Sequence, residues 1–176
     1  MPKGFKMKNQ KQISEHAQAA KNCRMFLKNK GIKCSVKSES YSMGSSVRVN
    51  IYNQPPEIVE MVTAELKKYQ YGHFDGMQDL YEHSNSRDDI AQVKFLFVNN
   101  EFSDEIFQKA WDFLRSKYPA NAKGLPVNYE NAKGLQFYEN APHWLTISED
   151  VGKLLAGNCY TLDAENSSEF WAEHAA

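Results

Sequence analysis

Two histidines and three acidic residues lie close together in one short segment, at His73, Asp75, Asp79, Glu82 and His83. Imidazole and carboxylate groups are common ligands of divalent metals. The spacing matches no metal motif such as His-Glu-x-x-His, and Asp and Gly are also ordinary turn formers. We therefore predict a turn here, with no metal, no cofactor and no catalytic residue assigned. A small metal-dependent enzyme remains an alternative.

A second candidate for chemistry is the polar segment 40–46, where five hydroxyl side chains accompany Gly44. The backbone N–H groups of such a loop can cradle a phosphate group. The segment lacks the Gly-Lys-Ser/Thr ending of a P-loop, and no predicted helix follows it. Hairpin loops often have the same composition, so we predict a long polar hairpin loop over 38–46.

Charge is distributed unevenly along the chain, although the net charge of all 176 residues is only −1. Residues 1–37 hold ten Lys or Arg and one acid, a net charge of +9. Residues 38–176 hold eleven bases and twenty-one acids, a net charge of −10. Such a division is typical of a nucleic-acid-binding arm or of a surface for an oppositely charged partner. A lysine-rich terminus that only aids solubility is the plain alternative.

The N-terminal bases fall into an arm and a helix face. Residues 1–12 are rich in Lys, Asn and Gln and predict a mobile arm. Lys21, Arg24 and Lys28 follow at the spacing of one helical face. Their cations would neutralise phosphates with strong salt dependence, and exposed tyrosines would stack on bases. The predicted nucleic-acid- or partner-binding residues are Lys3, Lys6, Lys8, Lys11, Lys21, Arg24, Lys28, Tyr41, Arg48 and Tyr52.

Composition places the chain among ordinary folded proteins. Apolar residues make up 41% and aromatic residues 12% of the sequence, which is enough for the core of one domain. No apolar stretch approaches the roughly 18 residues of a membrane span, so we expect no membrane contact. The three cysteines, Cys23, Cys34 and Cys159, form no Cys-x-x-Cys pair and predict neither a zinc site nor a disulfide framework. They suit a reducing cytoplasm.

Apolar periodicity divides the first two thirds of the chain into helices and strands. Alternation over 32–37 and 47–52 predicts an antiparallel hairpin, and the apolar run from Val93 to Val98 predicts a central strand. Residues 71–89 are predicted to be mostly loop. Helices are predicted over 14–30, 57–70 and 103–118. The expected fold class is α+β: a small, mainly antiparallel sheet (hairpin 32–52 plus strand 93–98) with the three helices packed on it.

The C-terminal third is expected to extend this core. Asn-Ala-Lys-Gly-Leu occurs at 121–125 and again at 131–135. Two copies are too few for a repeat protein, so we predict a hairpin-like pair of turns and strands. A short helix is expected over 148–156, a last strand over 159–162, and docking of Phe170 and Trp171 onto the body. The predicted domains are the arm 1–12, a core domain 13–118 and a C-terminal extension 119–176.

Three segments carry a resemblance to a known family. They are Ile32-Lys33-Cys34-Ser35-Val36-Lys37, Tyr41-Ser42-Met43-Gly44-Ser45-Ser46-Val47-Arg48-Val49 and Phe74-Asp75-Gly76-Met77-Gln78-Asp79. With them, residues 14–118 resemble the large polyvalent protein-associated domain 29 family. The resemblance implies a small α+β domain of phages and conjugative elements, without established catalytic residues. Its motif residues here are Ser42, Gly44, Ser45, Ser46, Phe74, Asp75, Gly76, Met77 and Asp79.

The Phe74-Asp75-Gly76-Met77 motif also has a physical interpretation. Asp75-Gly76 is expected to form a tight turn, with Phe74 and Met77 anchored in the core. This interpretation needs no active site.

The resemblance and the charge division lead to three hypotheses. The first is a non-enzymatic phage or mobile-element protein that binds and inhibits a host defence complex, of anti-CRISPR or anti-restriction type, in the bacterial cytoplasm. Its acidic body would occupy a basic protein surface, and its lysine-rich arm would add contact or steering. The second is an accessory protein that binds DNA or RNA through residues 1–37. The third is a small metal-dependent enzyme near Asp75, Asp79 and His83.

Overall fold

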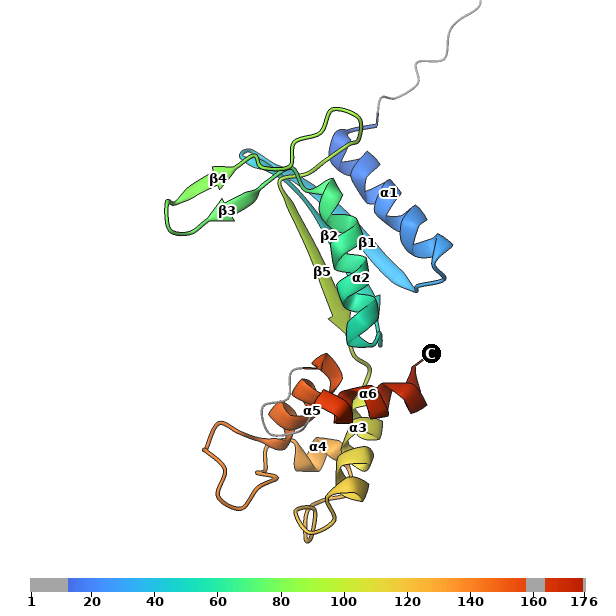
Figure 1. Cartoon of the computed structure of the whole chain (residues 1–176), viewed down its shortest axis with the longest axis vertical. Helices are drawn as coiled ribbons and strands as arrows, with labels where there is room; N and C mark the ends of the chain where they lie inside the picture. The colour runs from blue at the N-terminus through green and yellow to red at the C-terminus, as the bar shows by residue number, and fades with distance from the viewer. Residues whose placement is uncertain (1–12, 158–163, 176) are drawn as a thin grey trace, which may run out of the picture. The chain divides into compact units, whose positions relative to one another are not determined.

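The computed structural model describes residues 13–157 and 164–175 (Figure 1). The chain divides into two compact units. Unit 1 comprises Met1–Val49 and Leu66–Phe97, and unit 2 comprises Asn50–Glu65 and Val98–Ala176. The arm expected over 1–12 and the strand expected over 159–162 lie outside the described residues.

A three-stranded sheet has the strand order β1-β2-β5. Its strands are β1 (Cys34–Tyr41), β2 (Gly44–Tyr52) and β5 (Phe95–Glu101). β1 and β2 form the predicted hairpin. β2 and β5 run in the same direction, because Lys94 contacts Met43 before the two strands begin and Asn53 bonds Glu101 where they end. The α+β class is therefore confirmed, with a mixed sheet.

β5 lies at an edge of this sheet, so the prediction of a central strand is wrong. Val93, the first residue of the apolar run, is buried but precedes the strand and forms an isolated bridge with Gln70. Phe97, inside the strand, is 45% exposed. The apolar run therefore contains a buried residue that precedes the strand and an exposed aromatic residue within the strand. Apolar periodicity alone does not distinguish such a run from a buried central strand.

The β1–β2 hairpin has a tight turn at Ser42 and Met43, not the long loop predicted over 38–46. The two strands continue through the polar segment, whose side chains at 39–41 are exposed. Strand residues that are exposed on both faces show no apolar alternation, so the sequence pattern did not predict a strand here. The backbone groups of this segment belong largely to the strands, and the phosphate-cradling loop is not formed.

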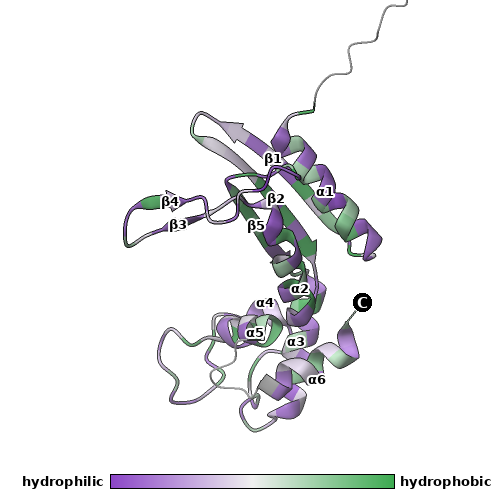
Figure 2. Cartoon of the chain, turned by 45° about the horizontal axis from the view of Figure 1, so that its top comes forward, coloured by the Kyte–Doolittle hydropathy of each residue, from purple (hydrophilic) through white to green (hydrophobic). Residues whose placement is uncertain are grey.

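Helix α1 (Glu15–Asn29) confirms the helix predicted over 14–30. Ser14 has the extended backbone of an N-cap, and Gly31 follows the helix with a left-handed φ of +71°. The buried face of α1 packs against β1. Its residues are Ala19, Ala20, Cys23 and Leu27. Figure 2 shows α1 beside β1, with hydrophobic residues along β2 and β5.

Helix α2 (Pro56–Leu66) and the 3₁₀ turn η1 (Lys67–Tyr69) occupy the region predicted as one helix over 57–70. Pro at the first helical position lacks the N–H that would have no partner there. Val62 and Leu66, four residues apart, are fully buried and mark the inner face of α2.

Residues 71–89 contain a short antiparallel hairpin where mostly loop was predicted. Its strands are β3 (His73–Asp75) and β4 (Leu80–Glu82). Strands of three residues are too short to give an alternating signal. Gly72 makes the pairing possible, because a Cβ there would overlap the carbonyl oxygen of Glu82.

Four helices of unit 2 that follow β5 share one hydrophobic core. They are α3 (Asp104–Lys117), α4 (Tyr129–Ala132), α5 (Ile147–Ala156) and α6 (Ala164–His174). Trp111, Leu154 and Phe170 are fully buried in this core, and Trp171 is nearly so. The predicted docking of Phe170 and Trp171 is therefore confirmed. No helix in the described part of the chain is long and apolar enough to cross a bilayer.

The helix ends of unit 2 lie where the capping residues of the sequence predict them. The Ser103 hydroxyl accepts from the Ile106 N–H at 3.4 Å, as its predicted capping role requires. Gly157 ends α5 with a left-handed φ of +76°. The hairpin predicted from the two Asn-Ala-Lys-Gly-Leu copies is wrong, because residues 119–146 contain turns and the short helix α4 and no strand.

Candidate functional site

The motif residues lie in two segments, 42–46 and 74–79, at one end of unit 1, where Lys94 joins them. The Lys94 ammonium donates to the Met43 carbonyl at 3.3 Å and lies 5.1 Å from the ring centroid of Tyr81. The Tyr81 hydroxyl in turn donates to the Lys94 carbonyl. Tyr81 stands opposite Phe74 in the β3–β4 hairpin. One lysine therefore contacts both the turn of the β1–β2 hairpin and the β3–β4 hairpin.

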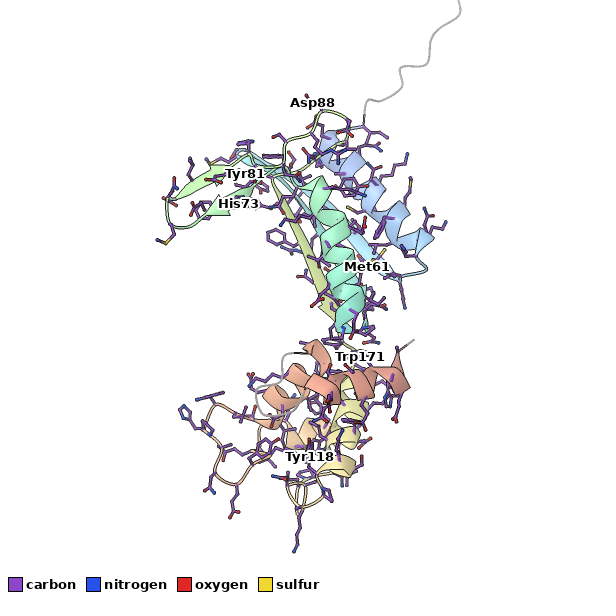
Figure 3. The ribbon with its side chains drawn as sticks, viewed as in Figure 1. Met61, His73, Tyr81, Asp88, Tyr118 and Trp171 are labelled. Atoms are coloured by element: carbon purple, nitrogen blue, oxygen red, sulfur yellow. The ribbon has the colours of Figure 1, made fainter. Side chains whose placement is uncertain are left out.

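The base of the β3–β4 hairpin is an aromatic cluster. Tyr71 stacks on His83 with a centroid distance of 5.1 Å, and Tyr81 packs edge-on against Phe95 at 5.6 Å. Burial raises the pKa of the Tyr71 and Tyr81 phenols. Figure 3 shows His73 and Tyr81 on this hairpin. The cluster fixes the hairpin to the sheet and leaves its tip free.

The tip of the hairpin is apolar and exposed, so the expectation that Phe74 and Met77 anchor the core is wrong. Met77 is 96% exposed and Phe74 54% exposed. The tight turn itself is confirmed, since the Asp75 carboxylate accepts from the Met77 N–H at 2.8 Å. A hairpin of two short strands has no second layer to bury these side chains. With Leu80 they form what we call the hairpin tip: Phe74, Met77 and Leu80.

Four of the five acidic and histidine side chains of this segment make local contacts: His73, Asp75, Glu82 and His83. His73 donates or accepts at Ser84 (3.0 Å) and lies 3.6 Å from the Glu82 carboxylate. His83 stacks on Tyr71. Within the described residues, no three His, Cys, Asp or Glu side chains gather as a metal site would require. The predicted turn is present at Asp75, and the structure offers no set of ligands for the metal-dependent alternative in that part of the chain.

A basic groove lies between α1 and β1 in unit 1. Arg24 and Lys28 line one side, and Lys33 lies in the connection to β1. The Arg24 guanidinium donates to the Val36 carbonyl at 2.6 Å. Burial raises the pKa of the Cys34 thiol, which also lines the groove. The thiol is therefore uncharged at neutral pH, and the charged side chains that line the groove are all positive.

The other predicted binding residues are dispersed. Lys21 is exposed on α1, and Tyr41 is exposed at the end of β1. Arg48 lies over the Phe97 ring, with 5.9 Å between the guanidinium carbon and the ring centroid. Tyr52 is half-buried in unit 2. The arm lysines Lys3, Lys6, Lys8 and Lys11 lie outside the described residues. The fold thus brings together Arg24 and Lys28 and adds Lys33, while the binding roles stay predictions.

The predicted binding residues named above do not include Lys33 and Lys94. Lys33 is a polar position of the alternating segment 32–37 and has no distinguishing pattern of its own. Lys94 did carry a signal, because it is the one charge in the apolar run from Val93 to Val98. Such an isolated charge indicates a specific contact, which here is the bridge between the two motif segments.

A small α+β module whose motifs lie on two adjoining hairpins is the class of protein that this fold defines. The chain belongs to the large polyvalent protein associated domain 29 family, whose model matches residues 14–108. The match confirms the resemblance and ends within α3. It associates the chain with phages and mobile genetic elements. No curated protein and no solved structure matches the chain.

Proposed function

We propose that this chain is an accessory protein of a phage or other mobile element that binds and inhibits a host defence complex, of anti-CRISPR or anti-restriction type, without catalysis. The observation that best supports the proposal is the separation of charge between the units. Unit 1 holds fifteen Lys or Arg and seven acids, a net charge of +8. Unit 2 holds six bases and fifteen acids, a net charge of −9.

The excess negative charge of unit 2 is displayed on its surface. Several of its bases lie beside an acid, in the pairs Lys109–Glu105, Arg115–Asp112, Lys117–Glu169 and Lys133–Glu130. On α6, Glu165, Glu169 and Glu173 are exposed and spaced four residues apart, so they share one face. An acidic surface of this kind complements the basic surface with which a defence protein holds nucleic acid.

Unit 1 would contribute contact and steering in the same complex. Its positive charge would favour approach to a nucleoprotein that presents phosphates. Its exposed hairpin tip offers apolar contact area of the kind that marks protein interaction sites. The partner in this proposal is a protein or nucleoprotein of the bacterial host, met in its cytoplasm.

Affinity capture tests the proposal. The tagged full chain is incubated with lysate of a bacterium that carries a defined CRISPR–Cas or restriction complex, with and without nuclease. We expect subunits of that complex to be retained after nuclease treatment, because the contact is with protein. Retention only in the absence of nuclease would contradict the proposal.

A second candidate function is nucleic-acid binding through the arm and α1. It is favoured by the exposure of Lys21, Arg24 and Lys28 on one face of α1. Deleting residues 1–12 should then weaken binding to DNA or RNA and flatten its salt dependence, because phosphate contacts are lost. Fluorescence anisotropy with a labelled oligonucleotide measures both quantities. A salt slope that the deletion leaves unchanged would contradict a role for the arm.

A further inference from the structure

We propose that the groove between α1 and β1 binds the phosphate backbone of a single nucleic-acid strand. The groove is an open hollow of about 650 Å³ lined by Arg24, Lys28 and residues 31–36. The inference rests on the nucleic-acid contact of the second candidate function and not on inhibition of a defence complex. It names the place of that contact and the form of nucleic acid that fits it.

The charge of the groove is uniformly positive. Arg24 and Lys28 come from α1, Lys33 comes from the connection to β1, and no acidic residue of the described chain lines the hollow. Arg24 and Lys28 have no ion-pair partner among the described residues. Because no ion pair to a described acid competes for Arg24 and Lys28, these two cations can attract an anionic ligand, so the groove suits phosphate groups.

The Arg24 guanidinium is held in position for such a ligand. Its hydrogen bond to the Val36 carbonyl, at 2.6 Å, fixes the group against β1. A guanidinium has five N–H donors in a planar fork and commonly grips a phosphate with two of them. The same bond occupies a carbonyl that an incoming strand would need. A protein segment that adds to β1 is therefore disfavoured.

The floor of the groove favours a single strand over a duplex. Ile32 and Cys34 are half-buried and Val36 is buried, which gives an apolar recess below the cations. Unpaired bases and sugars have apolar faces that such a recess accepts, whereas the bases of a duplex are already stacked inside. Lys21 extends the row of cations along α1 to a length of about 10 Å.

Fluorescence anisotropy with a labelled oligothymidine and the full-length chain tests the inference. The groove variant Arg24→Gln/Lys28→Gln is compared with Lys67→Gln/Lys68→Gln, which removes the same charge from unit 1 outside the groove. We expect the groove variant to bind at least about tenfold more weakly. Its slope of log affinity against log salt should be smaller by about 1.4, the value for two lost phosphate contacts on a single strand.

A third variant keeps the test valid if loss of Arg24 disturbs β1. Lys28→Glu changes one exposed residue in the last turn of α1 and should weaken binding while the melting temperature falls by no more than a few degrees. Equal losses in the groove and control variants would overturn the inference, because they would indicate charge alone. Competition by a duplex of the same length as strong as by the single strand would also overturn it, as would stronger competition by a polyglutamate peptide. None of these results bears on capture of a defence complex.

Discussion

Gly72 allows the closest backbone approach in the β3–β4 hairpin. A Cβ at this position would overlap the Glu82 carbonyl, which is backbone and cannot turn aside. We expect Gly72→Ala to lower the free energy of unfolding by about 1–3 kcal/mol. Gly76, at the tip of the same hairpin, has open space around it. Gly76→Ala should therefore change the free energy of unfolding by less than about 0.5 kcal/mol. Urea titration of both variants and the wild type measures these changes. Equal effects of the two substitutions would contradict this account of the hairpin.

The thiol of Cys23 links burial on α1 to pH. Burial raises its pKa from 9.0 to about 12. Above pH 9 the unfolded chain ionises this thiol and the folded chain does not. The uncharged, buried thiol therefore contributes its full stabilisation of the folded chain below pH 9, and this contribution is lost as the pH rises towards 12.

We expect the free energy of unfolding to fall more steeply above pH 9 in the wild type than in Cys23→Ala. The difference in slope should approach about 1.4 kcal/mol per pH unit, the value for one proton. Urea unfolding at a series of pH values measures it. Parallel curves for the two proteins would show that Cys23 is not shielded as described.

At the scale of elements, the end of α5 depends on one glycine. Gly157 has a φ of +76°, which a residue with a Cβ adopts at a cost of about 1–2 kcal/mol. Gly152 lies inside the same helix, and a methyl group added there would meet nothing within 4 Å. Thermal unfolding should show Gly157→Ala destabilised and Gly152→Ala stabilised by about 0.5–1 kcal/mol. The same sign for both would contradict the assignment of the helix end.

Helices were predictable from sequence because their signals are local. Ser14, Ser103 and Gly157 mark helix boundaries through backbone chemistry that needs no tertiary context. The β3–β4 hairpin was not predictable in this way. Its strands are three residues long, and its pairing depends on the missing side chain of Gly72 and on contacts to Lys94. Such contacts join residues whose proximity the sequence does not reveal.

The candidate surfaces were predictable only in part for the same reason. Helical spacing places Lys21, Arg24 and Lys28 on one face, and the structure agrees. The groove needs the fold, because Lys33 and the Val36 carbonyl reach α1 only when β1 packs on it. The exposure of Phe74 and Met77 reversed the expectation, since apolar type predicts burial only when a second layer exists to cover it.

For the whole molecule, the family match and the core of unit 2 have different limits. The match ends at residue 108, while the core that surrounds Trp111 and Leu114 includes residues up to Trp171. We expect a chain ending at residue 118 to lose cooperative thermal unfolding of α3, because both side chains would be exposed to water. The domain boundary suggested at residue 118 stays a prediction, and circular dichroism of this truncation tests it. Wild-type cooperativity in the truncated chain would show that α3 does not need the later helices.

The central proposal is that the chain inhibits a host defence complex through the acidic surface of unit 2. Phage plating on cells with a defined CRISPR–Cas or restriction system tests this proposal most directly. Expression of the full chain should raise plating efficiency, and Glu165→Lys/Glu173→Lys on α6 should abolish the rise. The control variant Glu39→Lys/Asp88→Lys adds the same positive charge to unit 1, and its expression should still raise plating efficiency. A wild-type chain that accumulates intact yet never raises plating, or an α6 variant that protects as well as the wild type, would contradict the account.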